Sequence, residues 1–182
     1  MRRLRVKLAI GVAAIGVVVT AAAAVAGDHA RVKTALTGYE ETPQAISTDG
    51  NGTLDVTISN GGDAIDYELT YDDLEGGAVQ QAHIHFGQEG VTGGVSAFLC
   101  SNLGNGPAGT QACPPPPATV TGTITTDQIV GPATQGIAAG ELDELIRAIR
   151  AGVAYGNVHT ATYPTGEIRG QLDGDRGHGD GH

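Results

Sequence analysis

Short stretches in which apolar and polar residues alternate run through most of the chain and are separated by glycine-rich turns. Such alternation is typical of strands with one face toward a core and the other toward water. The clearest pair is residues 54–58 and 65–71, which the turn at 60–63 joins into a predicted β-hairpin. The whole pattern predicts an all-β fold, an antiparallel, Greek-key-like β-sandwich of about eight strands.

Further strands are expected at six places, residues 32–39, 79–86, 95–100, 119–125, 153–159 and 167–172. One segment departs from this pattern, because Leu142, Leu145 and Ile149 fall at helical spacing. Acidic residues lie in the first turn of this segment and arginines near its end, as the helix dipole favours. We therefore expect one accessory amphipathic helix, ending before Gly152, that packs against one end of the sandwich.

The first 26 residues resemble a targeting segment, because four basic residues precede an uncharged stretch that ends in small residues. We expect a signal peptide at residues 1–26, one domain at 27–172, and a secreted, periplasmic or cell-envelope location. Left uncleaved, the segment would be a membrane anchor, since its apolar run is close to the roughly 20 residues that span a bilayer. Residues 173–182 contain no apolar side chain, which predicts a disordered tail of Gly, Asp and His.

The charge balance narrows the choice of partners. Residues 1–26 contain four of the ten basic residues and none of the 20 acidic ones, so the remainder has six basic residues and a net charge of −14. Such a charge repels nucleic acid and anionic lipid. We expect no nucleic-acid partner and membrane contact only through an uncleaved leader; a protein or glycan partner is not identified by these residues.

The two cysteines, Cys100 and Cys113, flank a stretch rich in Gly, Asn and Pro. An exported location allows a disulfide, which would close this loop. A metal–thiolate site is the alternative, although neither cysteine has a second cysteine or a histidine close in sequence.

Three histidines are the strongest chemical signal in the domain. His83 and His85 lie two residues apart on an expected strand, so their side chains leave the same face of the sheet. His159 lies on another expected strand, far along the chain. The apolar residues between and around them belong to the core face, which places the histidines on the outer face, where a loop can cover them. Three imidazoles with one water would suit copper or zinc.

A purely structural role is the alternative interpretation of the same residues. Asn157, Glu167 and Arg169 fall on the same outer surface as the histidines, and the whole polar cluster can hold strands and loops together through hydrogen bonds. In that arrangement Glu167 pairs with Arg169 or caps a loop backbone. The sequence contains no Gly-x-Ser-x-Gly motif and no activated cysteine, so no catalytic residue is assigned and enzymatic activity is not expected.

Several short motifs occur in an order that resembles a known family. They are Glu41-Thr42-Pro43, Ala82-His83-Ile84-His85, the amphipathic helix, Asn157-Val158-His159-Thr160 and Gly166-Glu167-Ile168-Arg169-Gly170-Gln171. Over about residues 32–172 the chain resembles the CHRD domain, the repeated module of chordin, a secreted antagonist of bone morphogenetic proteins. The cysteine-rich modules of chordin do not occur in these 182 residues, so growth-factor antagonism is not expected.

The resemblance implies a secreted or envelope-associated, non-enzymatic binding or structural module. The alternative is a copper- or zinc-binding protein, with redox activity as an option, that uses His83, His85 and His159.

Overall fold

The computed structural model describes residues 30–173, so the expected signal peptide and the expected tail beyond Asp173 lie outside the described residues. The strands are β1 (Arg31–Thr37), β2 (Asn51–Ile58), β3 (Ile65–Asp72), β4 (Val79–Phe86), β5 (Gly94–Ser101), β6 (Ala118–Ile124), β7 (Ala154–Thr160) and β8 (Ile168–Gln171). The helices are α1 (Leu142–Arg150) and the 3-10 turns η1 (Gly38–Glu40), η2 (Thr126–Gln128) and η3 (Ala133–Gln135). The all-β fold predicted from the alternation is confirmed.

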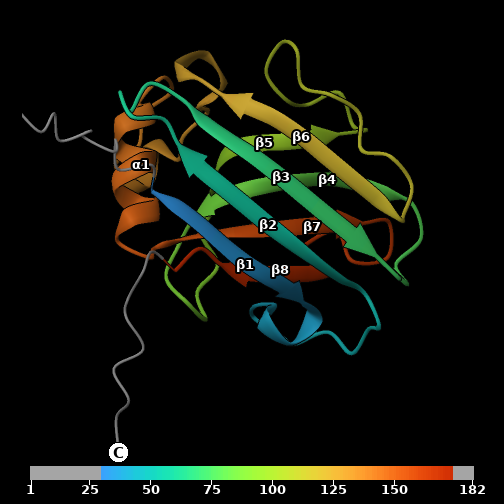
Figure 1. Cartoon of the computed structure of the whole chain (residues 1–182). Coiled ribbons are helices and arrows are strands. Elements are labelled where there is room, and N and C mark those ends of the chain that lie inside the picture. The colour runs from blue at the N-terminus through green and yellow to red at the C-terminus, as the bar shows by residue number, and fades with distance from the viewer. Residues whose placement is uncertain (1–29, 174–182) are drawn as a thin grey trace, which may run out of the picture.

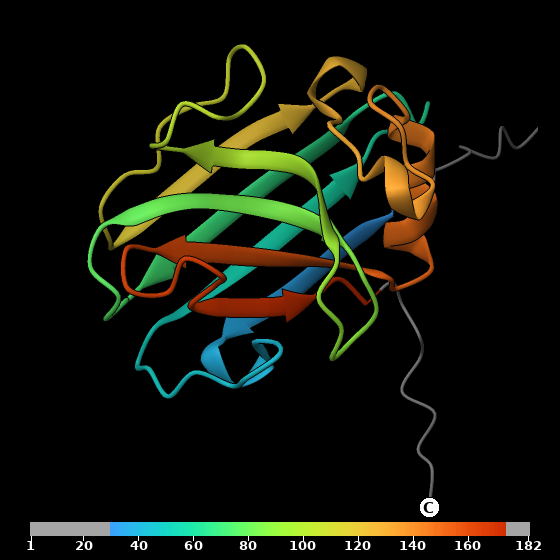
Figure 2. The ribbon, with the colours of Figure 1, turned by 180° about the vertical axis from the view of Figure 1, so that it is seen from behind.

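The eight strands form one antiparallel sheet in the order β5-β4-β7-β8-β1-β2-β3-β6. Two four-stranded halves of this sheet face each other, with β1, β2, β3 and β6 in one layer and β5, β4, β7 and β8 in the other (Figures 1 and 2). The halves are joined at a corner, where β1 meets β8 through the single pair Thr37 and Arg169. The molecule is thus a sandwich whose two layers belong to one nearly closed sheet.

The core lies between the two layers and is built by alternation along the strands. In β3, for example, Ile65, Tyr67, Leu69 and Tyr71 are buried while Asp66 and Glu68 are exposed. Helix α1 covers one end of the sandwich (Figure 1), with its apolar stripe buried, as the spacing predicts. Its C-terminal turn leads to Gly152, which has a φ of +66° and suits a glycine.

The two edge strands, β5 and β6, are connected by contacts other than a regular ladder. Ala97 of β5 forms an isolated bridge with Ile129, just after η2. The predicted disulfide between Cys100 and Cys113 is confirmed, and it ties the end of β5 to the segment that leads into β6. Tyr67 donates its hydroxyl hydrogen to Leu99 O at 2.7 Å, which links β3 to β5.

One expected strand ends early, because the chain turns at Gly38 into η1 instead of continuing to Tyr39. The Gly38 carbonyl accepts a hydrogen bond from Ile46 N at 2.7 Å, which closes the loop that follows. Residues 38–50, 87–93 and 161–167 are loops beside the outer face of β4, β7 and β8 (Figure 2). These loops determine whether the polar side chains on that face are buried or exposed to solvent. No helix in residues 30–173 is long and apolar enough to cross a membrane.

Candidate metal site

Strand pairing brings the three histidines together. In the ladder between β4 and β7, His85 lies opposite Tyr155, His83 opposite Asn157, and Gln81 opposite His159. His159 is therefore diagonal to His83 on the same face of the sheet. The face is the outer one, since the alternate residues of β4, Ala82 and Ile84, point into the core and have no exposed surface.

Although they leave the outer face, all three imidazoles are buried. The exposed fractions are 2% for His83, 7% for His85 and 5% for His159. Phe98 of β5 packs edge-on against His83, with ring centroids 4.4 Å apart. The loops at 87–93 and 161–167 supply the carbonyls that contact the other two rings. The site is a buried cluster between sheet and loops, not a surface patch.

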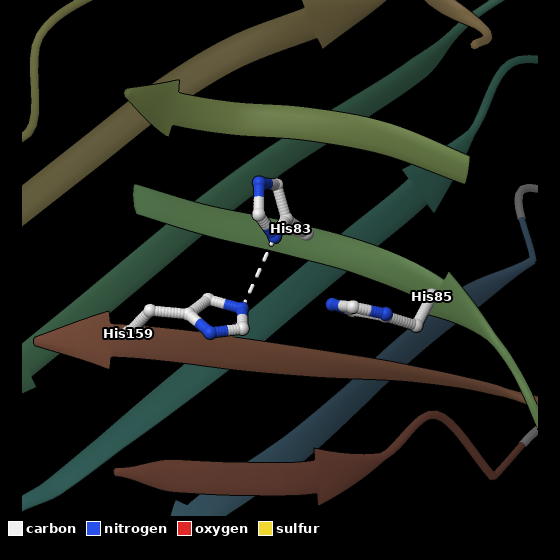
Figure 3. Close-up of side chains that lie close together, drawn as sticks. All are labelled: His83, His85 and His159. Atoms are coloured by element: carbon white, nitrogen blue, oxygen red, sulfur yellow. Dashed lines mark hydrogen bonds between the residues drawn. The ribbon is translucent and has the colours of Figure 1, made fainter. Parts of the chain in front are cut away.

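The ring nitrogens converge on one point. His83 Nδ1 lies 3.1 Å from His159 Nε2, and Figure 3 shows His85 directed at this pair. One nitrogen from each ring belongs to a group whose members all lie within 4.8 Å of one another. Two imidazole nitrogens on one zinc ion are about 3.3 Å apart. The closest pair already has this spacing, and the widest must shorten by about 1.5 Å to hold an ion.

Two backbone carbonyls set the protonation of the rings. His85 Nδ1 is 3.0 Å from Gly93 O, and His159 Nδ1 is 3.1 Å from Pro164 O. A carbonyl only accepts, so each Nδ1 carries the hydrogen and each Nε2 keeps its lone pair. Without an ion, His83 then donates its Nδ1 hydrogen to His159 Nε2. Imidazoles that donate one ring hydrogen to a carbonyl while offering the other nitrogen are the usual arrangement of histidine metal ligands.

Burial keeps the rings uncharged. Burial, together with the neighbouring His159 and His85, lowers the pKa of His83 to about 2. Burial also lowers the pKa of His85 to about 4, against the raising effect of its bond to Gly93. His159 behaves likewise, with a pKa of about 4. At neutral pH the cluster therefore consists of three neutral imidazoles.

Some of these nitrogens have no hydrogen-bond partner. Among the described residues, the buried side-chain atoms without one are His83 Nε2, His85 Nε2 and Ser96 Oγ. Leaving a buried polar atom unpaired costs about 1–3 kcal/mol. A cluster that served only to hold strands together would be expected to satisfy these atoms, and the lone pair of His85 Nε2 instead faces the other two rings.

A second layer of side chains supports the histidines. Tyr155 stacks on His85 with centroids 4.7 Å apart and planes 6° apart. The guanidinium of Arg169 lies 3.5 Å from the centre of the same Tyr155 ring. Arg169 also donates to Thr42 Oγ1 at 2.6 Å and to Gln88 O at 3.0 Å, so it fixes two of the loops. Strand order places β4 and β8 on opposite sides of β7, which puts Tyr155 between His85 and Arg169.

Asn157 connects this layer to a residue that the sequence analysis did not place in the site, Glu41. Asn157 Nδ2 donates to Glu41 Oε1 at 2.5 Å and to Ile168 O at 3.2 Å. Glu41 is only 7% exposed, and burial raises its pKa to about 7 despite the bond from Asn157. The signal in the sequence was its place in the Glu41-Thr42-Pro43 motif, but nothing there indicated burial beside Asn157.

Glu167 lies apart from the histidines and caps loop backbone, which was one of its two expected roles. Its carboxylate accepts hydrogen bonds from Glu75 N at 2.6 Å and Gly76 N at 2.9 Å. Two hydroxyls, those of Thr48 and Thr160, donate to it at 2.8 and 2.7 Å. Glu167 therefore joins two loops, the one before β2 and the one between β3 and β4, to the end of β7. Arg169 binds Thr42 and Gln88 instead of Glu167.

The fold and the site define an all-β domain with a buried cluster of three histidines beneath its loops. In a comparison with known families, the CHRD domain matches residues 32–172, which is most of the chain. The chain therefore belongs to the CHRD domain family. No curated protein and no solved structure matches it.

Proposed function

We propose that this CHRD protein is an exported, non-enzymatic module that binds one copper or zinc ion through His83, His85 and His159. The observation that carries the proposal is the state of His85: its Nδ1 is committed to Gly93 O, while its buried Nε2 has no hydrogen-bond partner and faces the other two imidazoles. Imidazole nitrogen is a good ligand for both metals.

The surrounding contacts favour a metal site over a purely structural cluster. Loop carbonyls fix the tautomer of two of the three rings, His85 and His159. Each of these rings therefore keeps the lone pair of its Nε2 directed toward the cluster. The rings are also neutral at physiological pH, so binding an ion requires no net release of protons; His83 only has to move its hydrogen from Nδ1 to Nε2. The exported location is part of the proposal and rests on the charge and apolarity of residues 1–26.

The test is metal analysis of the full chain produced without a histidine tag. Three histidines lie outside the described residues, so the measurement uses the triple variant His29→Gln/His178→Gln/His182→Gln, called the background variant below. We expect about one copper or zinc ion per chain by mass spectrometry. Adding His83→Gln, His85→Gln or His159→Gln to the background variant should remove it.

Folding has to be checked in parallel, because a destabilised variant would also lose its metal. Gln81→Asn is a matched control, since Gln81 lies opposite His159 on β4 and is not one of the three histidines. It should keep full metal content. If the background variant binds neither ion more tightly than about 10 μM, the proposal is wrong and the cluster is structural.

A further inference from the structure

We propose that the site selects the monovalent cuprous ion, Cu(I), over divalent Zn(II) and Cu(II). This inference rests on the proposed function and specifies its ligand. It follows from the charge of the donor set, the burial of the rings and a nearby arginine.

The donor set carries no negative charge. The described groups that can share a metal ion contain His83, His85 and His159 and no carboxylate or thiolate. The buried carboxylates of the surrounding loops have other partners, since Glu41 binds Asn157 and Glu167 binds loop backbone. An ion that binds here would therefore keep its full charge, +1 for Cu(I) and +2 for Zn(II) or Cu(II).

Burial makes that difference large. The cost of moving an ion from water into a low-dielectric interior rises with the square of its charge, so a divalent ion loses about four times as much hydration as a monovalent one of equal size. All three ligands are less than 8% exposed, so solvent contributes little screening. Sites that hold divalent ions at such depth usually include an anionic ligand, and this one does not.

Arg169 adds a fixed positive charge behind one ligand. Its guanidinium lies against Tyr155, which in turn stacks on His85. No carboxylate in residues 30–173 lies within salt-bridge distance of Arg169, and those of Glu41, Glu40 and Glu89 act on its charge only from further away. Repulsion from Arg169 acts twice as strongly on a divalent ion as on a monovalent one.

Coordination number points the same way. Zinc sites are almost always four-coordinate, so three protein ligands leave a position that water must fill. Cu(I) is stable with three ligands in a plane and needs no water. A buried cluster of three convergent nitrogens meets that requirement without a fourth donor.

The experiment compares affinities in the background variant. Cu(I) is measured without oxygen, in competition with bathocuproine disulfonate and with ascorbate as reductant, since a thiol would reduce the Cys100–Cys113 disulfide. Zn(II) is measured in competition with a pyridylazo-resorcinol dye, and Cu(II) in air against a chelator of known affinity. We expect Cu(I) to bind at least about a thousandfold more tightly than Zn(II).

The outcomes separate this inference from the proposed function. Zn(II) or Cu(II) binding within tenfold of Cu(I) would overturn the selectivity and leave metal binding intact. Failure of all three ions to bind would overturn the proposed function itself.

A second variant tests the electrostatic cause. Arg169→Gln removes the charge while leaving an amide that can still bond Thr42 or Gln88. It should lower the ratio of Cu(I) to Zn(II) affinity about tenfold. The ratio is informative even if the variant is less stable, because a general loss of structure lowers the affinities for Cu(I) and Zn(II) alike. The control Lys33→Gln, which removes an exposed charge on β1, should leave the ratio unchanged. An unchanged ratio in Arg169→Gln would exclude Arg169 as a cause of the selectivity for Cu(I).

Discussion

His85 and Tyr155 lie directly opposite each other on β4 and β7, with ring planes 6° apart and centroids 4.7 Å apart. The Tyr155 hydroxyl also accepts a hydrogen bond from Gly93 N at 3.0 Å. Gly93 is the residue whose carbonyl accepts the Nδ1 hydrogen of His85. Tyr155 thus restrains His85 in two ways, through its ring and through the loop that sets the tautomer.

The first prediction separates these two effects. Tyr155→Leu removes both the stack and the hydroxyl, and it should weaken metal binding by about 10–100-fold, the usual effect of losing a group that orients a ligand. Tyr155→Phe keeps the stack and loses only the bond to Gly93, so the loss should be about threefold. Both are measured by the Cu(I) competition titration. Tyr39→Phe is the control, since Tyr39 is 74% exposed. Wild-type affinity in Tyr155→Leu would show that Tyr155 does not position His85.

Much of the fold could be predicted because alternation reports directly on which side of a strand is buried. It placed the core positions of β3 and the outward direction of His83, His85 and His159. A period of two cannot say whether an outward side chain meets water or a loop, because covering loops are set by tertiary contacts. His85 and His159 bind carbonyls of such loops, at Gly93 and Pro164, and no local sequence pattern predicts these contacts.

The same limit explains Glu41. It is separated from Asn157 by 116 residues and meets it only because the chain turns at η1 and folds back toward β7. An exposed carboxylate and a buried one look alike in sequence, since burial of Glu is decided by the partner that receives it. Motif order indicated the family but not the contact.

The second prediction concerns Glu167, which accepts hydrogen bonds from two backbone amides and two hydroxyls. Glu167→Gln replaces one acceptor oxygen by an NH₂ group, which cannot accept from the donor facing it. The free energy of unfolding should fall by about 2–3 kcal/mol. Chemical denaturation measures this, with Glu68→Gln on the exposed face of β3 as the control, expected within about 0.5 kcal/mol of wild type. A comparable small effect in Glu167→Gln would mean that the loops do not depend on this carboxylate.

The third prediction concerns the disulfide. Cys100 and Cys113 are separated by 13 positions and enclose a loop without regular structure. Cys100→Ser/Cys113→Ser should lower the free energy of unfolding by about 3 kcal/mol, mainly because the unfolded chain gains freedom. The comparison is with wild type in oxidising buffer. Since the chain has no other cysteine, reducing wild type should reproduce the variant, and a difference between the two would point to strain from the serines.

The fourth prediction is the pH dependence of the metal-free protein. The folded pKa values of the three histidines lie below the unfolded value of about 6.5. The unfolded chain therefore takes up protons that the folded one does not. Stability from this source is fully present above pH 6.5 and is lost as the pH falls toward 4.

Glu41 acts in the opposite direction, because its folded pKa of about 7 lies above its ordinary value. Its contribution is present below about pH 4.5 and is lost as the pH rises through 7. Between pH 5 and 6.5 three histidines oppose one glutamate, so stability should fall by about 2 kcal/mol per unit decrease in pH. Denaturation midpoints at pH 5, 6, 7 and 8, with a chelator present, measure this slope.

Glu41→Gln isolates the glutamate. The amide can still accept the hydrogen bond from Asn157 through its oxygen, and it removes the cost of burying a negative charge above pH 7. The variant should therefore be more stable than wild type at pH 8 and should lose stability more steeply as the pH falls below 6.5. Glu89→Gln, in the exposed part of the loop after β4, is the matched control and should follow the wild-type curve. If Glu41→Gln also follows that curve, the Glu41 carboxyl is solvated in solution and the loop that begins at η1 does not close over Asn157.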